Sequence, residues 1–261
     1  MIALASAPAL TAKDSKFVLR PIGRDDRLAT TAAAYLKTNF SGKNVGALSY
    51  ETSQGIAAML RAAAANLQFP LKLFETVKPG SPHPDWANTV DVLVAAGVPA
   101  ALFDQIVKQH DKPSIVLVTN VMLDQHYAAL APSKRTVAIA NPDASLFPDA
   151  KAAMESGKKQ NMTTTGYFIY AYAGVQIFAN LAKKAGSVSS DKLAEVARSE
   201  PVPSPLGPLK FDALGDPVGW RFALFSGGPE VTVKALDLAA VDLCKTDQCS
   251  QLDYCKPCPS N

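Results

Sequence analysis

The amino-acid sequence predicts an α/β fold with parallel sheets flanked by helices. A short apolar run at residues 44–50 is flanked on both sides by Ala-rich stretches of helical length. Further apolar runs alternate with helix-like stretches up to residue 140. A helix between two strands allows both strands to run in the same direction, so this alternation predicts a parallel sheet. Ligands of such sheets bind at the carboxyl ends of the strands.

The first part of the chain begins with two short predicted strands, residues 2–6 and 17–19. The opening stretch has no Lys or Arg before Lys13, so a strand is favoured over a signal peptide. Asp25 or Asp26 is expected to cap a helix over residues 27–40, because carboxylates accept the free N–H groups of a first turn. A strand at 44–50 and a helix at 53–67 follow.

The next part continues the alternation to residue 140. Pro and Gly at 79–82 predict a turn, and His83 precedes a helix that we expect to run to Ala96. The remaining elements are predicted from apolar runs between polar connections. They are strands at 71–76, 100–103, 114–119 and 136–140, with a helix near 123–130.

After Asn141-Pro142 the sequence becomes mainly helical. We predict helices at 149–156, 163–185 and 190–199, and the aromatic face of the second is expected to pack in the core. A Pro-rich linker covers 201–208. The segment GPLKFDALGDPVGWRFALF, residues 207–225, predicts a hairpin with a Gly-Asp turn.

All four cysteines lie in the C-terminal tail, CKTDQCSQLDYCKPC. An even number of closely spaced cysteines favours disulfides in an oxidising compartment. A small zinc site and a reduced tail stay open, since one half of the tail has CxxC spacing. The candidates are Cys244, Cys249, Cys255 and Cys258, and the sequence does not select among the three pairings.

Composition excludes several classes of protein. A chain with 48% hydrophobic and 19% charged residues is typical of globular proteins, which argues against disorder. The formal net charge of +3 is small and scattered, so we expect no nucleic-acid partner. No apolar run reaches the roughly 18 residues that a membrane-spanning helix needs.

The sequence carries no recognisable catalytic motif. His83, His110 and His126 lack the spacing of metal ligands, and no GxSxG, GxxxxGK[ST] or GxGxxG motif is present. Helix capping explains the Asp25-Asp26 pair. A Ser/His/Asp triad scattered along the sequence stays open. We therefore expect a protein that is not an enzyme, with no cofactor and no metal.

Two segments carry a family resemblance. Residues 19–67, LRPIGRDDRLATTAAAYLKTNFSGKNVGALSYETSQGIAAMLRAAAANL, and residues 207–225 together resemble the type I periplasmic solute-binding proteins of the branched-chain amino acid/amide ABC-transporter family. The Leu/Ile/Val-binding proteins belong to that family. The resemblance covers nearly all of residues 1–235. It implies a two-lobed type I architecture in which the first lobe is incomplete, because its N-terminal part has no counterpart before Met1.

The resemblance also implies a domain organisation. Residues 1–23 and 141–235 would form the partial first lobe, residues 24–140 the second α/β lobe, and residues 236–261 the Cys-containing tail. Crossings between the lobes are expected at residues 20–26, 140–145 and 211–219.

The same resemblance implies ligand contacts. Ala5 and Ser6 would offer backbone groups and a hydroxyl, although Ser6 also suits a simple turn. Asp104 would pair with a ligand ammonium group, although it could equally cap a helix. The full implied set is Ala5, Ser6, Tyr50, Gln54, Phe103, Asp104, Gln105 and Asn120.

The expected function is non-catalytic binding of a small polar solute in an interlobe cleft, for delivery to an ABC permease from the periplasm. The solute would be an amino acid, an amide or a small carboxylate. The alternative is a shortened relative that acts as an interaction or sensor module without transport. Expected partners are the solute and the permease, with a homodimer or a complementing chain in addition.

Overall fold

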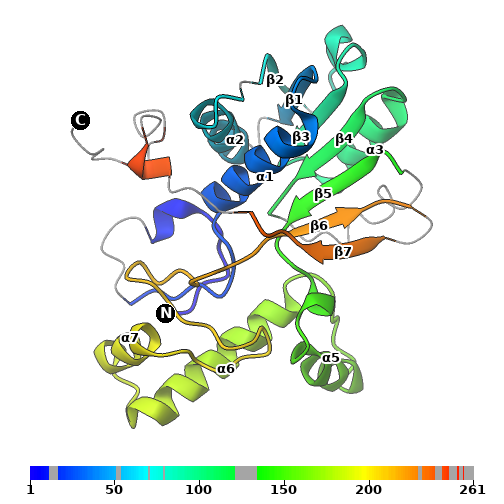
Figure 1. The fold of residues 1–261 in the computed structure, drawn as a ribbon. Coiled ribbons are helices and arrows are strands. Elements are labelled where there is room, and N and C mark those ends of the chain that lie inside the picture. The colour runs from blue at the N-terminus through cyan, green and yellow to red at the C-terminus, as the bar shows by residue number, and fades with distance from the viewer. Residues whose placement is uncertain are drawn as a thin grey trace. The chain divides into compact units, whose positions relative to one another are not determined.

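The chain folds as two compact units, seen in the computed structural model of Figure 1. Unit 1 comprises residues 1–24 and 142–221, and unit 2 comprises residues 25–141 and 222–261. The chain therefore passes between the units at three places. The structure describes residues 1–11, 17–50, 54–69, 71–78, 80–120, 134–228, 231–238, 243–246, 252 and 255.

Unit 2 is built on one seven-stranded sheet in the order β2-β1-β3-β4-β5-β6-β7. All pairings from β2 to β5 are parallel, whereas β5–β6 and β6–β7 are antiparallel. This confirms the predicted α/β class with a parallel sheet. The strands are β1 (Val45–Tyr50), β2 (Leu73–Val77), β3 (Val92–Ala96), β4 (Ser114–Val118), β5 (Thr136–Ala140), β6 (Ala223–Ser226) and β7 (Thr232–Ala235).

The central strands of this sheet are buried along their whole length. Every residue of β1 and β3 is buried, as expected for parallel strands that are covered on both faces. The helical elements of unit 2 are α1 (Asp25–Phe40), α2 (Gln54–Asn66), η3 (Asp85–Asn88), α3 (Ala100–Gln109) and η6 (Leu243–Lys245). α1 packs along α2, and α1 buries an apolar stripe that includes Leu28 and Leu36.

The ring of Trp86 lies so close to the backbone of β1 that position 46 has room only for a glycine. A Cβ atom on Gly46 would lie 2.5 Å from a ring carbon of Trp86 in η3. The η3 segment therefore packs directly onto the strand backbone.

Two predicted elements in unit 2 are wrong. The helix expected up to Ala96 is instead the short helix η3 followed by strand β3, and the strand expected at 100–103 is the first turn of α3. The run Val92–Ala96 has no alternation because both faces of β3 are buried, so its pattern resembles that of a buried helix. The helix predicted near 123–130 lies outside the described residues.

The sheet also contains residues that the sequence placed elsewhere. β6 and β7 lie within residues 141–235, the segment that the resemblance placed in the first lobe, and here they pair with β5 in unit 2.

Unit 1 is mainly helical in its described residues. It contains η1 (Pro8–Leu10), η5 (Ala144–Leu146), α5 (Ala150–Lys159), α6 (Phe168–Ala185) and α7 (Ser190–Ser199). α6 begins later than the predicted Thr163 and ends, as predicted, at Gly186, which adopts the left-handed conformation of a helix C-cap with φ of 57°. Its buried face packs with Leu19, Val202 and Phe211.

The predicted strands at 2–6 and 17–19 reduce to a single parallel bridge between Ile2 and Leu19. The predicted hairpin is present as an antiparallel bridge between Phe211 and Pro217. Its turn lies against residues 18–20, because the backbone N–H of Arg20 donates to the carbonyl of Gly215 at 2.8 Å.

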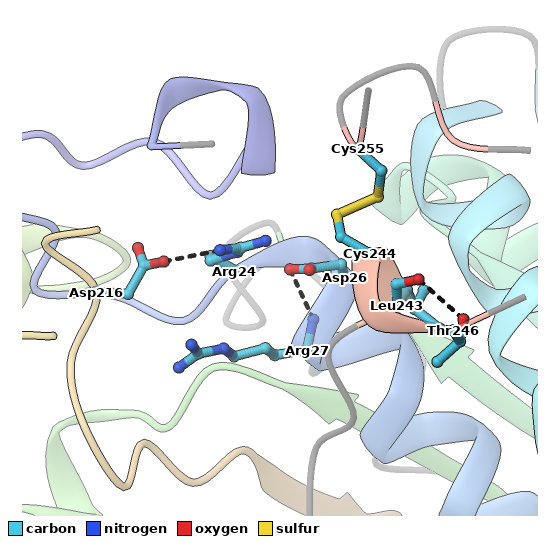
Figure 2. The surroundings of a disulfide bond; sticks show 8 residues. All are labelled: Arg24, Asp26, Arg27, Asp216, Leu243, Cys244, Thr246 and Cys255. Atoms are coloured by element: carbon cyan, nitrogen blue, oxygen red, sulfur yellow. Dashed lines mark hydrogen bonds and ion pairs between the residues drawn. A yellow bond between two sulfur atoms is a disulfide. The ribbon is translucent and has the colours of Figure 1, made fainter. Parts of the chain in front are cut away.

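A buried ion cluster holds this part of unit 1 together. Asp216 is fully buried, forms an ion pair with Arg20 Nε at 3.0 Å and accepts from Arg24 Nη1 at 3.0 Å (the Arg24 contact is drawn in Figure 2). Arg20 Nη2 also donates to Thr11 Oγ1 at 2.8 Å and to the carbonyl of Ala7 at 3.0 Å. The cluster therefore ties Ala7, Thr11, Arg20 and Arg24 to the hairpin.

Candidate functional site

The candidate site of unit 2 is the edge where its five parallel strands end. Because β1 to β5 run in one direction, their carboxyl ends share this edge, which is the usual ligand position in open α/β sheets. The residues at or just after these ends are Tyr50, Val77, Gly97, Thr119, Asn120 and Asn141.

Tyr50, the last residue of β1, is 1% exposed. Its hydroxyl lies 2.9 Å from Nε2 of His83. A buried tyrosine keeps its hydroxyl satisfied in this way while the ring packs in apolar surroundings. Tyr50 is thus fixed at the end of β1, where the family resemblance implies a ligand contact.

His83 continues this contact into a chain of hydrogen bonds. Its Nδ1 lies 2.9 Å from Nε2 of His110, and Nδ1 of His110 lies 2.8 Å from Oδ1 of Asn88. Because an amide oxygen only accepts, His110 carries its proton on Nδ1, His83 donates from Nδ1, and Tyr50 donates to His83 Nε2. Three side chains therefore donate in one direction, with both imidazoles neutral.

Burial favours this neutral form of the rings. It lowers the pKa of His83 below its usual 6.5. The pKa of His110 is lowered by burial and by His83, and Asp111 partly opposes this. The two rings stack with centroids 5.1 Å apart. The sequence predicted no role for these histidines, because they are 27 residues apart and only the fold brings them together.

Asn120, which follows β4, contacts the start of α1. Its Nδ2 donates to Oδ1 of Asp25 at 3.0 Å. Asp25 and Asp26 are both buried in the first turn of α1, where the N-terminal helix dipole stabilises a negative charge. The Asp26 carboxylate accepts the backbone N–H of Arg27 at 2.9 Å (Figure 2), which is the expected role at a helix start.

Phe103, Asp104 and Gln105 lie within α3 and not at the end of a strand. Phe103 is fully buried, and Asp104 is half-buried and pairs with Lys108 at 2.6 Å. The strand before them ends at Ala96, so Gly97 occupies the carboxyl end at which Phe103 was predicted.

The remaining predicted contacts lie apart from this set. Ala5 is exposed and Ser6 is buried just before η1 in unit 1. Gln54 begins α2, and its side chain lies outside the described residues.

The C-terminal tail contains a disulfide between Cys244 and Cys255, with Cα atoms 5.0 Å apart (Figure 2). This confirms the predicted disulfide chemistry for two of the four cysteines. Cys244 lies in η6, where Thr246 Oγ1 donates to the carbonyl of Leu243 at 2.8 Å. Cys249 and Cys258 lie outside the described residues.

The described residues contain no candidate cluster of metal ligands. Within the described residues, no three His, Cys, Asp or Glu side chains are placed to hold one ion. The Tyr50–His83–His110 chain and the Asn120–Asp25 pair are instead arrangements for holding polar groups at fixed positions.

The proteins similar to this chain, by sequence and by structure, include solute-binding proteins. No protein-family model matches the chain. It is 23% identical over 246 residues to the leucine-, isoleucine-, valine-, threonine- and alanine-binding protein of Pseudomonas aeruginosa, covering 87% of this chain and 65% of that protein. It is 26% identical to a Leu/Ile/Val-binding protein homolog of Brucella abortus, covering 84% of this chain and 62% of that protein.

Solved structures share the fold at lower identity. An amino acid ABC transporter substrate-binding protein from Pseudomonas fluorescens matches with a TM-score of 0.76 at 14% identity, over 93% of this chain and 72% of that one. A solute-binding protein from R. palustris in complex with benzoate matches with a TM-score of 0.72 at 14% identity, over 92% and 71%.

The curated relatives are longer than this chain. The chain spans about 60 to 65% of their length. Sequence and fold together identify the chain as a relative of the Leu/Ile/Val-binding proteins with the type I periplasmic-binding-protein fold.

Proposed function

We propose that the chain binds a small polar solute without catalysis, at the carboxyl edge of the unit 2 sheet. The observation that carries the proposal is the shared edge of five parallel strands, where Tyr50 and the Asn120–Asp25 pair are held in place. A buried carboxylate beside an amide suits a ligand with an ammonium or amide group. An amino acid, an amide or a small carboxylate fits this chemistry.

The comparisons support the same class of solute. Relatives are named for binding leucine, isoleucine, valine, threonine and alanine, and one structural neighbour holds benzoate. Delivery of the solute to an ABC permease, and a place in the periplasm, are further parts of the proposal. The Cys244–Cys255 disulfide suits an oxidising compartment.

Tyr50 and Asn120 are the side chains that we propose for solute contact in unit 2. The contacts expected of Ala5, Ser6 and Gln54 stay predictions. Phe103, Asp104 and Gln105 were predicted as contacts because they were expected to follow a strand directly. They lie within α3 instead, so we do not include them in the proposed site.

Thermal shift and calorimetry test this proposal. The compounds are leucine, isoleucine, valine, threonine, alanine, benzoate and p-hydroxybenzoate. A ligand at a hundred times its dissociation constant adds about 2.7 kcal/mol to the free energy of unfolding. We expect one class to raise the melting temperature in a dose-dependent way.

Matched variants locate the effect. Asn120→Ala is expected to weaken binding, whereas the control Asn39→Ala, whose amide donates only locally to the Tyr35 carbonyl, is expected to bind as the parent does. A cooperative melt that no compound shifts would contradict the proposal and favour an interaction module. Equal binding by both variants would remove Asn120 from the site.

A further inference from the structure

The hydrogen-bonded chain of Tyr50, His83, His110 and Asn88 leads from the proposed solute site to solvent. Exposure differs along it. Tyr50 and His110 are buried, His83 is half-buried and Asn88 is exposed. Tyr50 ends β1 at the carboxyl edge of the sheet, whereas Asn88 ends η3. The chain therefore connects a side chain that we propose for solute contact with one that water reaches.

With both rings neutral, the Tyr50 hydroxyl can only accept a hydrogen bond from a further partner. It has two lone pairs and one hydrogen, which it donates to His83 Nε2 over 2.9 Å. Within the described part of the chain this hydroxyl makes no second hydrogen bond. A solute group that meets it in this state must therefore donate, as an ammonium group or an amide N–H does.

A proton on His83 reverses the role of the hydroxyl. Once Nε2 of His83 carries a hydrogen, it donates to the Tyr50 oxygen, and the hydrogen of the tyrosine turns to another acceptor. The bond between the rings stays intact, because His83 still donates from Nδ1 to His110 Nε2. A solute carboxylate is such an acceptor, and the positive charge on the ring attracts it as well.

His83 is the ring of the pair that can take up a proton without losing a hydrogen bond. A proton on His110 Nε2 would face the N–H of His83, and His110 is only 2% exposed. His83 instead gains a donor toward Tyr50, and it lies closer to solvent. Burial lowers the pKa of His83, so this proton is taken up below the usual value of 6.5.

Two charged side chains from other segments lie near the pair. Asp111, which follows α3, raises the pKa of His110 and so opposes the effect of burial. Arg135, which precedes β5, donates to the carbonyls of His110 and Pro113 at 3.3 and 2.7 Å. Among the described residues, no charged group forms a hydrogen bond with the His83 ring. Burial and the contacts with Tyr50 and His110 therefore determine the protonation of His83.

We propose that protonation of His83 changes the solute preference of the unit 2 site from hydrogen-bond donors to carboxylates, by reversing the Tyr50 hydroxyl. This rests on the proposed function, because it needs a solute at Tyr50. At neutral pH the hydroxyl accepts from an ammonium or amide group, and in mild acid it donates to a carboxylate. His83 is thus a positioning residue that adapts one site to two chemical classes of solute.

Imidazole nitrogen chemical shifts test the reversal without any solute, because they report which ring nitrogen carries a hydrogen. The parent chain is titrated from about pH 8 to about pH 5. We expect His83 Nε2 to gain a hydrogen while His110 Nε2 stays without one. Protonation of His110 before His83, or no change at His83 over this range, would overturn the proposal.

Benzoate and benzylamine are matched probes of the preference, since they share a ring and keep opposite charges in mild acid. Calorimetry gives both dissociation constants at about pH 7.5 and about pH 5.5. We expect the preference for benzoate over benzylamine to rise about tenfold or more at the lower pH. His83→Gln does not titrate and Tyr50→Phe has no hydroxyl, so both variants are expected to lose most of this change.

Asn88→Asp is expected to shift the pH at which the preference changes. A carboxylate beside His110 favours the positively charged pair, so the change should occur at a higher pH than in the parent chain. Asn39→Asp is the matched control, because Asn39 is exposed on α1 and its amide donates to the Tyr35 carbonyl. It is expected to leave the pH of the change as it is. An equal shift in both variants would contradict the role of the histidine pair.

The binding results separate this proposal from the proposed function. A parent chain that binds leucine but neither probe, or that keeps one preference at both pH values, would overturn the reversal and leave the proposed function standing. Absence of binding by every compound would contradict both. The full change in Tyr50→Phe would show that the charge of His83 acts without the hydroxyl, which would also overturn the reversal.

Discussion

His83 Nδ1 lies 2.9 Å from His110 Nε2, so two imidazole rings share one hydrogen bond inside unit 2. His110 is 2% exposed, and its other nitrogen is bound to Asn88. The arrangement needs one donor and one acceptor between the rings. A second proton on His110 would place two N–H groups against each other, so the pair favours the neutral rings.

This pair is expected to make unit 2 less stable in mild acid. The pKa values of both rings are lowered in the fold, whereas an unfolded histidine titrates near 6.5. Below pH 6.5 the unfolded chain therefore binds more protons than the folded chain. The stabilisation is complete above pH 6.5 and is lost as the pH falls through the lowered values.

Urea denaturation at pH 7.5 and pH 5.5 measures this effect. The midpoint is expected to fall at the lower pH, and to fall less in His83→Gln, which removes one titrating ring. The same decrease in both proteins would show that other groups cause the pH dependence.

Tyr50→Phe is expected to lower the free energy of unfolding by about 1 kcal/mol, because His83 Nε2 loses its donor. Tyr35→Phe is the matched control, since the Tyr35 hydroxyl forms no hydrogen bond with any of the described residues. Chemical denaturation of both variants gives the comparison. An equal effect of the two substitutions would show that the hydrogen bond between Tyr50 and His83 does not contribute to stability.

Much of the fold could be predicted from local patterns. α1 and α7 have acidic residues in their first turns, and Gly186 ends α6, so their positions follow from capping chemistry. Strands β1, β4 and β5 are short apolar runs between polar turns. These elements are locally consistent, and their sequence alone identifies them.

The misplaced elements depend on tertiary packing. Val92–Ala96 is a strand because helices and η3 cover both faces of the sheet, and nothing in its own pattern separates it from a buried helix. Because of that error, the strand was expected to end at Phe103 and not at Ala96. Asp104, the next residue, was therefore predicted as a ligand contact. The histidine pair was missed for a different reason, because 27 residues separate its members and no motif links them.

Gly215→Ala is expected to destabilise unit 1 by about 3 kcal/mol or more. Gly215 has a φ of 84°, and an added Cβ would lie 1.9 Å from the backbone oxygen of Val18. Gly207→Ala is the control, since Gly207 has the same φ with nothing within 4 Å, and about 1 kcal/mol is expected there. Similar thermal melts for the two variants would show that the hairpin moves away from Val18 without cost.

Loss of the Cys244–Cys255 disulfide is expected to lower the free energy of unfolding of unit 2 by up to about 3 kcal/mol, because the bond closes a loop with a separation of 11 residues. The double variant Cys244→Ser/Cys255→Ser is compared with the parent chain, each with and without reductant. The reductant should shift the parent and leave the variant unchanged. A shift of equal size in the variant would assign the effect to the other cysteines.

Asp216→Ala is expected to be the most damaging of these substitutions to unit 1. It leaves the guanidinium groups of Arg20 and Arg24 buried without their shared carboxylate, and breaking a buried ion pair in this way costs about 3 to 5 kcal/mol. Asp104→Ala is the contrast, because its pair with Lys108 is exposed and is worth about 0.5 kcal/mol or less. Added salt should change the Asp216→Ala difference little, since a buried pair is weakly screened, and should reduce the small Asp104→Ala difference, since an exposed pair is screened. A loss of less than about 1 kcal/mol in Asp216→Ala would mean that water replaces the carboxylate, and the cluster would then not be what holds the hairpin against residues 18–20.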